Sequence, residues 1–122
     1  MQAKPAAADA DAYGETLARA SVLIVDDEPG MRNFLTKTLS PRCKRVEQAE
    51  SADAAARRLD SHHFDLVVLD NTMPGKTGLQ WLREQRRVGF FGDAILITAY
   101  ADLETAITAL RAGVADFVLK PF

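Results

Sequence analysis

Short apolar runs that stop at a polar residue constrain the fold of this 122-residue chain more than any other feature. The first run is Val22–Val25, which stops at Asp26 and Asp27. Three later runs have the same form: Leu66–Leu69, Ala94–Ile97 and Phe117–Leu119. Strands that are apolar on both faces belong to sheets covered by helices on both sides, and such sheets are usually parallel. The runs therefore predict an α/β fold with a buried parallel sheet.

Segments with helical spacing alternate with these runs. Pro29 can occupy a first helical turn, and Met31, Leu35 and Leu39 then fall on one face. Further helices are predicted after Ser51 as a cap, around Leu79 and Leu82, and over 103–111 with Gly113 closing the last. A shorter strand is expected over 44–48. Five strands and four helices in alternation predict an open, mostly parallel sheet with right-handed crossovers.

Composition excludes several classes of protein but does not indicate an activity. Fifteen basic and seventeen acidic residues give a net charge of −2 with no basic stripe, which argues against direct binding to DNA or RNA. The single cysteine, Cys43, excludes an internal disulfide and fits a reducing compartment. No apolar run reaches the roughly 18 residues of a membrane span, and residues 1–10 lack the apolar core of a signal peptide. We expect a soluble cytoplasmic domain.

The polar residues at the strand ends are the candidate site. Asp26 and Asp27, Asp70, Thr98 and Lys120 each follow an apolar run, and in a parallel sheet these ends share the edge where ligands bind. Three carboxylates held together favour a divalent cation, and oxygen ligands with room for water suit Mg²⁺. An anion that meets Mg²⁺, an ammonium and a hydroxyl together is most simply a phosphoryl group. A carboxylate in that setting can act as the nucleophile and form an aspartyl phosphate.

Four strings of residues carry a resemblance to a known family. They are Val25-Asp26-Asp27-Glu28, Leu69-Asp70-Asn71-Thr72-Met73-Pro74-Gly75, Thr98-Ala99-Tyr100 and Lys120-Pro121-Phe122. Together they resemble the receiver domain of two-component response regulators over residues 21–122, and Ala112–Phe117 is also typical of it. The resemblance implies a doubly wound, five-stranded parallel sheet in the flavodoxin-like order 2-1-3-4-5.

The family's roles carry over by position. Asp70 resembles the phosphoacceptor, while Asp26 and Asp27 match the acidic pair that binds Mg²⁺. Asp70 and the backbone carbonyl of Thr72 would complete the protein's metal ligands. The remaining matches are the switch hydroxyl of Thr98, the phosphoryl-pairing Lys120, the rotating aromatic Phe117, and Thr72 and Tyr100, which tune the lifetime of the acyl phosphate.

The resemblance also implies partners. The phosphoryl donor would be a phosphohistidine on a sensor kinase, and the domain would be a switch and not an enzyme, apart from self-phosphorylation with Mg²⁺ and slow hydrolysis. Residues 98–122 are similar to those of nitrogen-regulation-type regulators, which drive an ATPase and a DNA-binding module. Transcription is then the expected output, on a part of the protein beyond this sequence, and a homodimer is compatible with the family.

Three other functions fit the sequence less well. Phosphotransferases of the haloacid dehalogenase type also form an aspartyl phosphate, but they carry a second aspartate two residues later, where this chain has Thr72. A flavodoxin-like cofactor binder needs a phosphate loop after its first strand, and Asp26-Asp27-Glu28 would repel that phosphate. A degenerate receiver that acts without phosphate is disfavoured because every signature residue is present.

Several positions depart from the family pattern or lack a role. Asn71 replaces the usual apolar residue after the phosphoacceptor, and the sequence stops at Phe122, before the family's fifth helix. Residues 1–20 are Ala-rich and read as a flexible leader or a short helix, so the receiver would span 21–122. Trp81 is expected to be partly exposed because Leu79 and Leu82 occupy the inner face, and His62 and His63 are expected at the surface.

Overall fold

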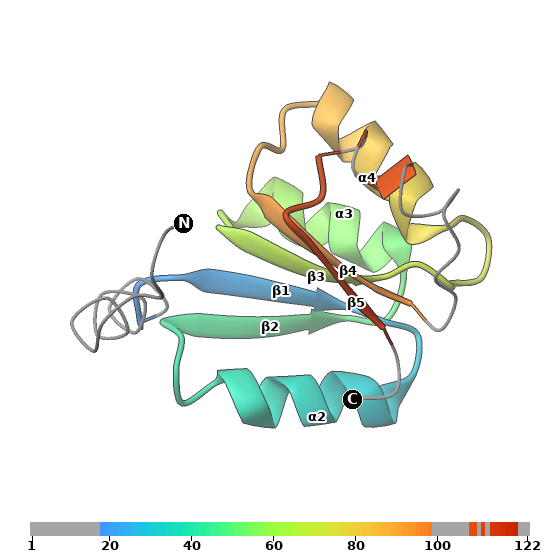
Figure 1. The fold of residues 1–122 in the computed structure, drawn as a ribbon. Coiled ribbons are helices and arrows are strands. Elements are labelled where there is room, and N and C mark those ends of the chain that lie inside the picture. Colours follow the sequence, from blue (N-terminus) through green and yellow to red (C-terminus); the bar gives the residue numbers. More distant parts are fainter. Residues whose placement is uncertain (1–17, 99–107, 110, 112, 120–122) are drawn as a thin grey trace, which may run out of the picture.

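A computed structural model describes residues 18–98, 108, 109, 111 and 113–119, with only the backbone for 116, 117 and 119 (Figure 1). Its sheet contains β1 (Ser21–Val25), β2 (Arg45–Ala49), β3 (Leu66–Asp70), β4 (Asp93–Thr98) and β5 (Asp116–Leu119). The strands lie in the order β2-β1-β3-β4-β5, and each neighbouring pair is parallel. The parallel α/β architecture predicted from the apolar runs is confirmed. Strand β2 begins and ends one residue later than expected.

Helices cover the two faces of the sheet (Figure 1). Helix α2 (Pro29–Leu39) lies on one side, and α3 (Ala52–Ser61) and α4 (Gly78–Arg87) lie on the other. Alternate residues of β1 divide between the faces: Val22 and Ile24 pack with Leu35 of α2, while Leu23 and Val25 pack in the cluster with α3 and α4. This alternation is the period of two that a strand imposes on its side chains. It explains why β1 is apolar throughout.

Local sequence signals set where the helices begin. The Ser51 hydroxyl accepts the backbone N–H of Ala54 at 3.1 Å, so the predicted cap of α3 is confirmed. Helix α4 starts with a capping box between Thr77 and Gln80. The helix predicted over 103–111 falls mostly outside the described residues. At its end Gly113 has a φ of 80°, as a helix-closing glycine should.

Trp81 corrects the sequence-based expectation for α4. Its side chain is only 1% exposed, whereas partial exposure was predicted from the positions of Leu79 and Leu82. The indole belongs to the core cluster that also contains Ala109 and Val114. The core around α4 thus includes residues distant in sequence, which helical spacing alone does not reveal.

Candidate metal centre

Three carboxylates meet at the carboxyl edge of the sheet. Asp26 and Asp27 follow β1 directly, and Asp70 is the last residue of β3, the strand beside β1. One carboxylate oxygen from each aspartate lies within 4.8 Å of the other two. Because adjacent parallel strands end at the same edge, residues 44 positions apart are brought into one cluster.

The burial of these groups makes their proximity costly. Asp26 is 1% exposed and Asp70 is 4% exposed, while Asp27 is exposed. Two unit charges about 5 Å apart repel by about 3 kcal/mol at an effective dielectric constant of about 20. A divalent cation between the oxygens would turn this repulsion into attraction. The donor set consists of carboxylate oxygens open to solvent on the Asp27 side, which fits Mg²⁺ with several retained waters.

Asp26 is held in place by its neighbours. The backbone N–H of Glu28 donates to Asp26 Oδ1 at 2.9 Å, and Arg32 Nη1 donates to the Asp26 carbonyl at 2.8 Å. The same guanidinium donates from Nε to Gln48 Oε1 of β2 at 3.2 Å. Arg32 thus ties the loop after β1 to the edge strand. Arg32 was not predicted as a site residue, and its only signal in the sequence is a basic residue one turn into the helix that follows the acidic pair.

Asp70 and Thr98 end neighbouring strands. Asp70 lies opposite Ile97 in the register of β3 and β4, so Thr98 follows one residue beyond on β4. The Thr98 side chain is 1% exposed. The backbone N–H of Thr72 donates to Asp70 Oδ1 at 3.2 Å, which fixes one carboxylate oxygen toward the loop after β3. Carboxylate and hydroxyl are therefore presented by adjacent strand ends.

The other predicted site residues are placed only in part. Tyr100 and Lys120 lie outside the described residues. The backbone of Phe117 lies in β5 opposite Leu96 of β4, and its side chain is outside the description. Thr72 is described and exposed.

Two histidines and the single cysteine lie outside the candidate site, and the predicted surface position of the histidines is confirmed. His62 and His63 are exposed, away from the aspartates, on the segment between α3 and β3. Cys43 is half-buried, and burial raises the pKa of its thiol, which disfavours the reactive thiolate.

Comparison with known proteins identifies the family. The family model for the response regulator receiver domain matches residues 22–122. The chain therefore belongs to the response regulator receiver domain family, whose members act as phosphoacceptor switches in two-component systems.

Individual relatives agree with this assignment. The chain is 38% identical over 101 residues to the regulatory protein AtoC of Escherichia coli, covering 83% of this chain and 22% of that protein. It is 37% identical over 106 residues to the transcriptional regulatory protein MalR of Bacillus subtilis, covering 84% of this chain and 44% of that protein. The chain thus spans less than half the length of these relatives.

A solved structure supports the fold and the kind of ligand. The response regulator TrrA of Thermotoga maritima, determined in complex with Mg²⁺ and BeF, aligns with a TM-score of 0.72 at 32% identity. The alignment covers 84% of this chain and 88% of that one. Receiver domains bind Mg²⁺ at an acidic pocket, and this chain has a cluster of three aspartates at the carboxyl edge of its sheet. The dehalogenase-type alternative gains no support from these comparisons. Within the described part of the chain, every helix is too short or too polar to span a bilayer.

Proposed function

We propose that Asp70 is the residue that accepts the phosphoryl group. The observation that carries this proposal is the position of its carboxylate: at the end of a central strand, 4% exposed, and within 4.8 Å of the Asp26 and Asp27 oxygens. The other two aspartates follow β1 and bring their carboxylate oxygens to the same cluster, which suits them to the role of metal ligands beside Asp70.

The reaction is a transfer from nitrogen to oxygen. A carboxylate oxygen of Asp70 attacks the phosphorus of a phosphohistidine on a sensor kinase. The new P–O bond forms as the P–N bond breaks, and the imidazole keeps the electron pair and takes up a proton. Small acyl phosphates can serve as donors in the same way, with a carboxylate leaving. Slow attack of water then hydrolyses the aspartyl phosphate, so the domain resets itself without being an enzyme that turns over a separate substrate.

Magnesium would be held by Asp26, Asp27, Asp70 and the backbone carbonyl of Thr72. When bound, it supplies charge neutralisation for the anionic donor and for the developing phosphoryl charge. The protein's own contribution is to position the Asp70 carboxylate, which the Thr72 N–H orients at 3.2 Å, and to keep Asp26 in place through Glu28 and Arg32.

Other residues would read the phosphoryl group. Thr98 donates its hydroxyl to a phosphoryl oxygen, Lys120 pairs with a second oxygen, and Phe117 repacks as Thr98 moves. Tyr100 and Thr72 tune access of water to the acyl phosphate. Such a change biases an equilibrium between two packings of the domain.

The wider role is control of transcription. We assign the receiver to residues 21–122 of a cytoplasmic regulator, with residues 1–20 as a leader and the output carried on ATPase and DNA-binding modules of the nitrogen-regulation type. The support is the similarity to AtoC and to the transcriptional regulatory protein MalR. Full-length protein that drives transcription equally with and without its phosphoryl group would contradict this role.

Intact mass spectrometry tests the phosphoacceptor. The chain is incubated with acetyl phosphate and Mg²⁺, beside a sample in EDTA and beside Asp70→Asn. We expect a gain of one phosphoryl group in the wild type with Mg²⁺ and none in the two comparisons. An equal gain in folded Asp70→Asn would show that the acceptor lies elsewhere.

A further inference from the structure

Asn71 joins three elements at the site. Its N–H donates to the carbonyl of Ile97 in β4 at 2.9 Å. Its own carbonyl accepts the N–H of Gly78 at 3.0 Å, and its side-chain Oδ1 accepts the N–H of Leu79 at 3.1 Å. The residue next to the proposed phosphoacceptor is therefore bonded to the strand that carries Thr98 and to the first turn of α4.

The first turn of α4 divides its free N–H groups between two anchors. Helices leave their first N–H groups without intrahelical partners, and caps supply them. Thr77 and Gln80 satisfy each other through the local capping box, at 3.1 and 2.9 Å. The N–H groups of Gly78 and Leu79 instead bond back across the loop to Asn71. The capping box stabilises the first turn locally, and the hydrogen bonds to Asn71 attach that turn to the end of β3.

The contact at Gly78 shows how close this second anchor brings the helix. A Cβ at position 78 would lie 2.5 Å from the backbone oxygen of Asp70 and 3.1 Å from Asn71 Cα. Only glycine permits that approach. Helix α4 therefore starts against the backbone of Asp70, and the loop 72–77 between them is closed at its base.

We propose that Asn71 is a positioning residue that holds the loop 72–77 in its metal-binding arrangement. This inference rests on the proposed function of Asp70. The loop includes Thr72, whose N–H orients Asp70 and whose carbonyl is the proposed metal ligand. The Asn71 side chain orders the loop before the metal binds. The entropic cost of ordering the loop therefore does not reduce the free energy of Mg²⁺ binding.

An apolar residue at this position could not do the same. Asn71 is half-buried, and an apolar side chain offers no acceptor to the Leu79 N–H. A net hydrogen bond of this kind is worth about a threefold to tenfold change in an equilibrium constant. Bound Mg²⁺ can itself order the loop. Removal of the Asn71 hydrogen bond should therefore lower the Mg²⁺ affinity and leave the phosphorylation rate at saturating Mg²⁺ unchanged.

The test compares Asn71→Leu with Thr77→Val. Both variants remove one side-chain acceptor from the start of α4, but only the first removes a link to β3. Mg²⁺ affinity is measured by calorimetry on the unphosphorylated chain, and phosphorylation by acetyl phosphate is followed by intact mass across a Mg²⁺ titration. Thermal unfolding checks that each variant is folded, and Asn71→Ala replaces Asn71→Leu if the larger side chain prevents folding.

We expect Asn71→Leu to weaken Mg²⁺ binding about threefold to tenfold, with the maximal phosphorylation rate within about twofold of wild type. Thr77→Val should bind Mg²⁺ like the wild type. Equal Mg²⁺ affinity in Asn71→Leu and wild type, or an equal loss in both variants, would overturn the positioning role while leaving the phosphoacceptor intact. A wild type that gains no phosphoryl group would instead overturn the proposed function, and this inference with it.

Discussion

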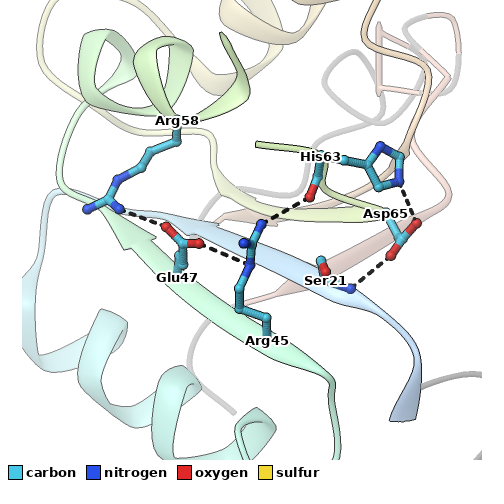
Figure 2. Close-up of polar contacts among 6 residues, drawn as sticks. All are labelled: Ser21, Arg45, Glu47, Arg58, His63 and Asp65. Carbon is cyan, nitrogen blue, oxygen red and sulfur yellow. Dashed lines mark hydrogen bonds and ion pairs between the residues drawn. The ribbon is translucent and has the colours of Figure 1, made fainter. Parts of the chain in front are cut away.

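The two edges of the parallel sheet carry opposite arrangements of charge. At the carboxyl edge three aspartates bring oxygens within 4.8 Å of one another, and two of the three are buried. Near the amino ends of the strands and along β2, charges of opposite sign alternate, as Figure 2 shows. The same fold thus places like charges together at the carboxyl edge, and complementary charges near the amino ends and along β2.

The charged groups drawn in Figure 2 pair with one another. Asp65 accepts the Ser21 N–H at 2.8 Å and contacts His63 Nε2 at 2.8 Å (Figure 2). Glu47 lies between Arg45 and Arg58, at 3.0 and 2.7 Å. The bond from the Ser21 N–H, followed by the contact with His63, holds the pKa of the Asp65 carboxyl below its usual value.

The comparison separates two uses of charge. Complementary pairs near solvent add little stability each, and they leave no cluster of like charges for a cation to relieve. Like charges that the fold forces together reduce the stability of the chain by itself, and a cation can recover that loss. The carboxyl edge is therefore where we expect a cation to bind.

The largest effect is expected from Asp26→Asn combined with Asp27→Asn. The amides keep the shape and an acceptor for the Glu28 N–H, but they remove repulsion, so the chain without metal should gain about 1–3 kcal/mol of stability. The rise in Tm that Mg²⁺ gives the wild type should disappear. Thermal unfolding with Mg²⁺ and with EDTA measures both. If Mg²⁺ stabilises the variant as strongly as the wild type, the carboxyl edge is not the place where the cation acts.

Gly78→Ala probes the same edge through the backbone. Alanine is the better helix former by about 1 kcal/mol, yet its Cβ would lie 2.5 Å from the Asp70 oxygen, and overpacking of this kind costs about 1–3 kcal/mol. We expect lower stability and weaker Mg²⁺ binding. Gly30→Ala in α2 is the control, because its nearest contact would be at 3.7 Å and it should be neutral or stabilising. Denaturant unfolding compares the two, and equal effects would argue against the close approach.

The smallest effect is expected from Asp65→Asn near the amino end. Because the folded-state pKa of Asp65 is lowered, its contribution is present above the unfolded pKa of about 3.9 and is lost as pH falls through the folded value. Its side chain is 46% exposed, so solvent screening keeps the contribution below about 1 kcal/mol. Wild type should be slightly more stable than the variant at pH 7, with the difference vanishing under acid. We expect Asp65→Asn to be phosphorylated at the wild-type rate. A slower reaction would contradict the claim that Asp65 takes no part in the chemistry at the carboxyl edge.

Sequence reasoning reached the strands and the acidic cluster because both follow from short-range rules. A strand buried on both faces must be apolar throughout, and parallel strands must end at one edge, so Asp26, Asp27 and Asp70 could be grouped in advance. The burial of Trp81 could not be predicted from helical spacing, since its core cluster includes Ala109 and Val114 from a distant part of the chain.

The roles of Arg32 and Asn71 also escaped prediction. Arg32 reaches the backbone of Asp26 and the side chain of Gln48, and no spacing pattern encodes a side chain that bonds to a carbonyl. Asn71 bonds to Leu79, eight residues away across a loop whose course the sequence does not specify. Residues that act through hydrogen bonds to the backbone of other elements become visible only in three dimensions.

The most direct test of the central claim is to find which residue carries the phosphoryl group. The chain is treated with acetyl phosphate and Mg²⁺, the acyl phosphate is reduced with borohydride, and peptides are sequenced by tandem mass spectrometry. Reduction converts an aspartyl phosphate into homoserine, and we predict homoserine at position 70. Homoserine at position 26 or 27 with Asp70 unchanged would contradict the account, because the metal ligands and the acceptor would then be exchanged.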